Sequence, residues 1–137
     1  MGILSEFFVA SPEAAQACED LIHTRAFEDQ AAYTGFTGLE LADLWAILAG
    51  TDYAPEQHLL ESVHDAQDSW LERFPAPFVA LLAGLDDQGL ASAQLQWAAS
   101  EELQLAPDVL RPVLEDLRRL AAKALAEGKG MYLWGSL

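Results

Sequence analysis

The chain has 137 residues, of which 52% are hydrophobic and 21% are charged, a composition that excludes a disordered chain and is typical of one globular domain spanning residues 1–137. Its formal net charge of −15 repels phosphate backbones and so argues against nucleic acid as a partner. No apolar run approaches the ~20 residues that span a bilayer, no basic leader is visible at the start, and the single Cys18 cannot form an internal disulfide. We therefore expect a cytoplasmic protein that does not enter the membrane.

The acidic charge is concentrated in the first part of the chain. Residues 1–74 carry fourteen carboxylates but only two bases, Arg25 and Arg73, whereas residues 75–137 carry eight carboxylates and five bases. Net charge governs solubility and association rather than fold. Three interpretations therefore stay open: a solubilising surface, a docking surface for a basic partner, or adaptation to salt.

Short aromatic and capping signals predict the first elements of the chain. Residues 3–10, ILSEFFVA, are apolar and aromatic and predict a strand. Ser11 and Pro12 suit the N-cap and the first position of a helix that would end near His23. Residues 24–37 then predict a loop with room for one short strand.

A capping pattern and an apolar stripe predict the clearest helix. Thr37 and Glu40 have the spacing of a capping box, in which each side chain satisfies a free backbone N–H group at the start of a helix. Behind them an apolar stripe recurs at helical spacing, formed by Leu41, Leu44, Trp45 and Leu48. Gly50 is suited to end this helix.

The middle of the chain is ambiguous at first and then helical. Residues 51–77 favour either a short helix or a short strand around Leu59–Val63. Pro75 and Pro77 interrupt that segment and open a helix with the sequence PFVALLAGL. Asp86 is a suitable N-cap for a further helix that carries apolar residues at helical spacing.

The end of the chain predicts a long helix followed by a terminal strand. Pro107 opens the helix and Gly128 ends it. The Gly-Lys-Gly sequence follows a helix rather than preceding one, so it does not form a phosphate-binding loop. Residues 131–134 predict a strand whose partner is the strand at residues 3–10. The expected fold class is α+β, with about five helices packed on a small sheet that contains both terminal strands.

Three segments of the chain resemble the YfbM-like family of small bacterial proteins. They are the MGI…EFFVA start, the helix LELADLWAILAG and the ending LEDLRRLAAKALAEGKGMYLW, which together cover about a third of the chain and follow one another in the family's order. The resemblance implies an α+β cytoplasmic fold. It implies no activity, so no functional residue is carried over from the family.

One segment could support metal-dependent chemistry. The sequence HLLESVHDAQD, residues 58–68, contains His58, and its Glu61, His64, Asp65 and Asp68 would lie within two turns if the segment were helical. Imidazole and carboxylate ligands suit zinc or iron, which makes a small hydrolase or metal-dependent enzyme the alternative function. The spacing differs from that of known zinc motifs, so we expect no metal site.

The leading hypothesis is a binding protein without enzymatic activity. The sequence contains no nucleophile elbow and no glycine-rich phosphate motif, so we expect no catalytic residue and no cofactor. Trp70 lies among acidic residues and belongs to no periodic stripe. An aromatic anchor surrounded by carboxylates suits a basic protein partner, as in an inhibitor or immunity-type factor. The expected partner-binding residues are Glu61, Asp65, Asp68, Trp70 and Glu72, and association with further copies of the chain stays open.

Overall fold

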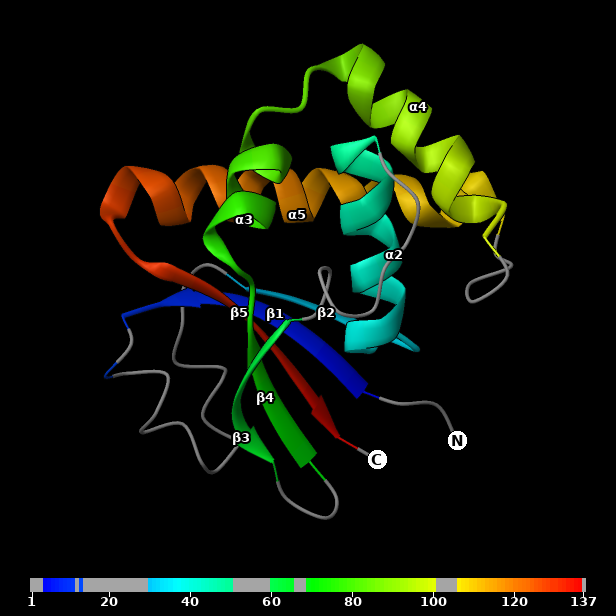
Figure 1. Cartoon of the computed structure of the whole chain (residues 1–137). Helices are drawn as coiled ribbons and strands as arrows, with labels where there is room; N and C mark the ends of the chain where they lie inside the picture. Colours follow the sequence, from blue (N-terminus) through cyan, green and yellow to red (C-terminus); the bar gives the residue numbers. More distant parts are fainter. Residues whose placement is uncertain are drawn as a thin grey trace.

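A five-stranded sheet forms one layer of the fold, and helices cover one of its faces (Figure 1). The computed structural model describes residues 4–11, 13, 30–50, 60–65, 69–100 and 106–136. The strands are β1 (Leu4–Ala10), β2 (Gln30–Thr34), β3 (Glu61–Asp65), β4 (Ser69–Arg73) and β5 (Gly130–Ser136). The helices within the described ranges are α2 (Gly38–Ala49), α3 (Ala76–Ala83), α4 (Asp87–Ala98) and α5 (Pro107–Glu127).

The terminal strand β5 is the central strand of the sheet. The strand order is β2-β1-β5-β4-β3, and every neighbouring pair is antiparallel. Residues of β5 pair with β1 on one side, as in Phe7↔Leu133, and with β4 on the other, as in Leu71↔Trp134. The predicted pairing of the two terminal strands is therefore confirmed, and β5 is buried from Gly130 to Gly135.

The main core lies between the sheet and the helices. From β5, Met131 and Leu133 point into this core, and from β1, Phe7 and Val9 do so. Helix α5 runs across the sheet and contributes its buried stripe, which comprises Leu110, Val113, Leu114, Leu117, Leu120, Ala121 and Ala124. The opposite face of the sheet carries a second, smaller apolar cluster of Phe8, Ala10, Leu71, Tyr132 and Trp134.

Three of the helix boundaries predicted from capping residues are confirmed. The Thr37 N–H group donates to Glu40 Oε2 over 3.0 Å at the start of α2, which confirms one half of the capping box. Gly89 N–H donates to Asp86 Oδ1 over 2.6 Å at the start of α4. Gly128 ends α5 in the left-handed conformation, with φ of 65°.

Two of the predictions need correction, and one falls outside the described ranges. Four helices are present in the described residues rather than about five, because the helix expected from Pro12 to near His23 lies outside them except for Glu13. Residues 61–65 form a strand, so the helical alternative for this segment is wrong. Strand β4 was not predicted, since only Leu71 of its five residues is fully buried and its apolar signal is correspondingly weak.

The loop before α2 is held by a buried hydroxyl group. Ser5 on β1 is fully buried, and its Oγ donates to the Phe36 carbonyl oxygen over 2.6 Å while accepting from the Phe36 N–H over 3.0 Å. Trp97 of α4 then donates from Nε1 to the Glu40 carbonyl oxygen over 3.0 Å. These bonds fix α2 against the sheet and against α4.

None of the helices in the described ranges is long and apolar enough to cross a membrane.

Candidate protein-binding site

The acidic segment singled out in the sequence forms a β-hairpin at one edge of the sheet. Strand β3 carries Glu61 and Asp65, and strand β4 carries Trp70 and Glu72. Asp68, between the strands, lies outside the described residues. The pairing places Asp65 opposite Trp70, and among the described strands β3 is the outermost at this edge. Four of the five predicted residues therefore belong to one hairpin.

The hairpin presents these residues on two faces rather than one. Residues directly opposite each other on paired strands share a face, and successive residues alternate between faces. Trp70 is opposite Gly135, two residues after the core residue Leu133, so Trp70 and Glu72 lie on the face that the helices cover. Glu61 is opposite Arg73 and lies on the other face. A partner would therefore have to reach both faces around the β3 edge.

Gly135 provides the surface on which Trp70 rests. A Cβ atom added at Gly135 would lie 2.3 Å from both Cε2 and Nε1 of Trp70, so the indole lies directly against the backbone of β5. Trp70 is nevertheless only half-buried. The sequence analysis missed Gly135, although a glycine in a strand is a recognised sign of close approach by another group. The indole is thus held in one position and remains partly accessible.

The carboxylate of Glu72 lies close to the start of α2. A Cβ atom added at Gly38, the first residue of that helix, would be 2.8 Å from Glu72 Oε1. The amino-terminal end of a helix carries partial positive charge, which stabilises a nearby carboxylate. Glu72 therefore has a role in the fold as well as a place beside Trp70, whereas Glu61 is exposed.

The other face of the hairpin lies beside the smaller apolar cluster. Tyr132 stacks on Phe8, with 5.5 Å between the ring centroids. Burial raises the pKa of the Tyr132 hydroxyl; Arg73 lowers it and the carboxylates of Glu13 and Glu61 raise it further. Opposite charges of the hairpin thus act on a tyrosine of the central strand.

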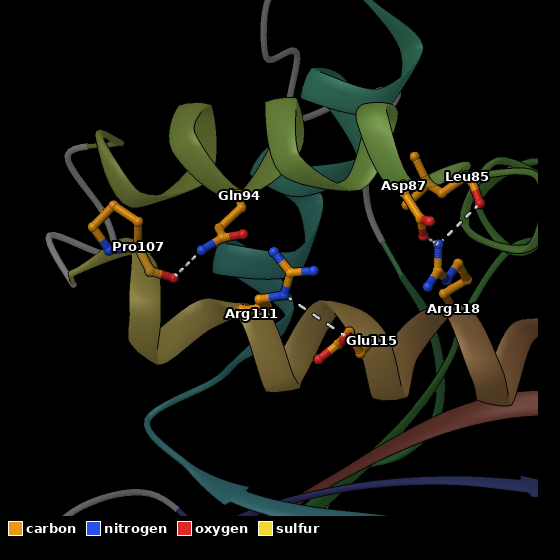
Figure 2. Close-up of polar contacts among 7 residues, drawn as sticks. All are labelled: Leu85, Asp87, Gln94, Pro107, Arg111, Glu115 and Arg118. Atoms are coloured by element: carbon orange, nitrogen blue, oxygen red, sulfur yellow. Dashed lines mark hydrogen bonds and ion pairs between the residues drawn. The ribbon is translucent and has the colours of Figure 1, made fainter.

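The basic side chains of α5, and that of Lys129 two residues beyond its end, are all engaged by carboxylates. Figure 2 shows Arg111 paired with Glu115 and Arg118 paired with Asp87. The remaining pairs are Arg119–Asp116 at 3.3 Å, Lys123–Glu127 at 3.0 Å and Lys129–Glu127 at 2.9 Å. Surface ion pairs of this kind contribute little stability, because water and salt screen them. These pairs matter more for the electrostatic field of the protein than for its stability. They neutralise the positive charges of α5 locally, so the remaining carboxylates determine the sign of the field.

Helix α5 is also anchored where it begins. Gln94 of α4 is 8% exposed, and its Nε2 donates to the Pro107 carbonyl oxygen over 2.7 Å, as Figure 2 shows. Arg118 reaches the Leu85 carbonyl oxygen as well as Asp87. These contacts fix the helical layer at two points along α5 and keep it on the face opposite the smaller apolar cluster.

The proposed convergence of metal ligands depended on a helix that the structure does not contain. In the strand β3, Glu61, His64 and Asp65 follow an extended backbone, interrupted by a register shift between Ser62 and His64. His58 and Asp68 lie outside the described residues. Across the part of the chain that the structure describes, no group of three or more potential ligands gathers around one point.

Comparison with known proteins identifies no relative of this chain. No protein-family model matches the chain, and neither a curated protein nor a solved structure shows a significant match. The resemblance to the YfbM-like family stays a prediction from the sequence pattern.

Proposed function

We propose that this chain is a non-enzymatic cytoplasmic protein that binds a basic protein partner through the β3–β4 hairpin, as an inhibitor or immunity-type factor would. The observation that carries the proposal is the position of Trp70. Its indole is held against Gly135 and half-buried, Asp65 is opposite it on β3, and Glu72 follows it by two residues.

The arrangement separates two contributions to binding. A rigid aromatic side chain loses little conformational freedom when it is covered, which suits Trp70 to the centre of an interface. Carboxylates at the rim mainly accelerate the encounter with a partner of opposite charge. Because Glu61 and Glu72 lie on different faces, the partner is expected to enclose the outer edge at β3 rather than rest on one face.

A capture experiment with matched baits tests the proposal. The hairpin bait carries Glu61→Gln and Asp65→Asn, and the control bait carries Asp108→Asn and Glu115→Gln on α5, so both lose the same charge. At low salt, the wild-type and control baits should retain a basic protein that the hairpin bait does not retain. The purified protein should then bind the wild type with an affinity that falls as salt screens the field.

Two results would reject the proposal. One is recovery of the same proteins by the hairpin and control baits, which would show that the interaction is a general effect of net charge. The other is recovery of no protein specific to the wild-type bait. In either case the carboxylates of the hairpin would serve only to keep the protein soluble.

A further inference from the structure

The two edges of the sheet differ in how well they are protected against pairing with another strand. An exposed edge offers unpaired backbone groups, and proteins block such edges with charged residues and bulges. Edge strand β3 has both devices: it carries Glu61 and Asp65, and its register with β4 shifts between Ser62 and His64. Edge strand β2 has neither device.

Strand β2 is a regular and uncharged edge. Its sequence, QAAYT, contains no charged residue and no proline, although the chain as a whole has a net charge of −15. It pairs with β1 without a register shift over all five residues, from Leu4↔Thr34 to Phe8↔Gln30. On its other side, no strand of the described ranges pairs with it.

The backbone of β2 is held in place from the helical side. The Tyr33 hydroxyl donates to Asp116 Oδ2 on α5, and the Tyr33 ring lies 6.2 Å from the rings of both Phe7 and Phe36. Asp116 also pairs with Arg119 over 3.3 Å, so the charge nearest to Tyr33 is already balanced. An edge that is ordered before it binds loses little entropy when it pairs.

We propose that β2 is a self-association edge, at which two copies of the chain pair antiparallel about a two-fold axis and form one continuous ten-stranded sheet. An antiparallel pair of identical strands is self-complementary, as a two-fold interface requires. With Ala32 at the axis, Gln30 of each copy lies opposite Thr34 of the other. The equivalent pairing of two β3 strands would instead join two edges that each carry the acidic residues Glu61 and Asp65 and an irregular register.

The net charge fixes how this association responds to salt. Two molecules that each carry −15 repel one another at low ionic strength, where the Debye length is about 30 Å at 0.01 M, and much less at physiological salt, where it is about 8 Å. Added salt therefore strengthens the dimer. Binding of a basic partner at the hairpin has the opposite salt dependence, so the two proposals stand or fall separately.

Sedimentation equilibrium tests the pairing with the intact chain. The wild type should show a monomer–dimer equilibrium whose dissociation constant falls about tenfold between about 0.02 M and about 0.5 M salt. Hydrogen exchange at rising protein concentration should slow for the amides of Gln30–Thr34 and not for those of β3. A wild type that stays monomeric at about 1 mM in 0.5 M salt overturns the proposal, as does a dimer protected elsewhere.

Two charge variants at the same positions supply the matched comparison. In the variant Gln30→Glu/Thr34→Glu, like charges lie opposite each other at both cross-strand positions, and the dimer should weaken about tenfold. In the variant Gln30→Lys/Thr34→Glu, each new lysine lies opposite the new glutamate of the second copy, and the dimer should be retained or tighten. Equal weakening in both variants, with native circular dichroism, would contradict the two-fold register.

Discussion

The position of Trp70 against Gly135 yields a prediction that can be tested by a double-mutant cycle. In the structure, a Cβ at Gly135 would lie 2.3 Å from Cε2 and Nε1 and 2.5 Å from Cζ2 of Trp70, far closer than ordinary contacts allow. The substitution Gly135→Ala must therefore displace either the indole or the central strand. Alanine is otherwise well tolerated in a strand, and replacing glycine there is favourable by about 0.5–1 kcal/mol.

Two estimates of the stability lost on Gly135→Ala agree. Overpacking of a well-packed site costs about 1–3 kcal/mol. Alternatively, expelling the indole to expose about 100 Å² of apolar surface would cost about 2.5 kcal/mol at about 25 cal/mol per Å². We expect Gly135→Ala to lower the free energy of unfolding by about 2 kcal/mol when Trp70 is present. In the Trp70→Ala background the same change should be neutral or stabilising.

Urea unfolding followed by far-UV circular dichroism is the appropriate assay, because it does not depend on the tryptophan that is removed. The four proteins of the cycle should show a coupling free energy of about 2–3 kcal/mol between positions 70 and 135. Equal costs of Gly135→Ala in the two backgrounds would refute the contact. A cost below about 0.5 kcal/mol in the wild-type background would do the same.

One truncation and two substitutions test other parts of the structure. Truncation after Gly130 removes the central strand, whose buried side chains each contribute about 1.5–3 kcal/mol, so the shortened chain should not fold; a melting temperature within a few degrees of the intact protein would contradict this. Ser5→Ala should cost about 2 kcal/mol in urea unfolding, because it leaves the buried N–H and carbonyl groups of Phe36 without their partner, and an unchanged midpoint would contradict this. Burial and the hydrogen bond to Asp116 raise the pKa of Tyr33 above its ordinary value of about 10. The stability that the protonated Tyr33 hydroxyl contributes is therefore complete below about pH 10 and is lost as the pH rises further. Tyr33→Phe should flatten this alkaline fall in the free energy of unfolding, and equal pH slopes in the variant and the wild type would contradict the hydrogen bond.

The sequence predicted the elements whose signals are local. The capping residues Thr37 and Asp86 and the terminal Gly128 each mark a helix boundary in the structure, because capping depends on residues within one turn. The strand at residues 131–134 was also correctly predicted. Its place at the centre of the sheet was not, since that depends on pairing with β4 as well as β1.

The β3–β4 hairpin shows why its strands and the faces of its residues could not be predicted from local sequence patterns. Its strands alternate between faces, and Leu71 is the one fully buried side chain within β4, so no apolar periodicity distinguishes them from a polar helix. Four of the residues grouped from the sequence, Glu61, Asp65, Trp70 and Glu72, lie on the two paired strands, and their role in binding stays a prediction. The sequence could not show that Glu61 and Glu72 lie on opposite faces, because the register with β4 and the contact with Gly135 are set by residues far away in the chain.

The association rate with the captured basic protein tests the central proposal most directly. Stopped-flow measurements over a range of ionic strength should show that the rate falls steeply with salt for the wild type and for the Asp108→Asn/Glu115→Gln control. The Glu61→Gln/Asp65→Asn variant should associate more slowly at low salt and show a shallower dependence. Identical salt slopes for the hairpin and control variants would contradict recognition through the β3–β4 hairpin.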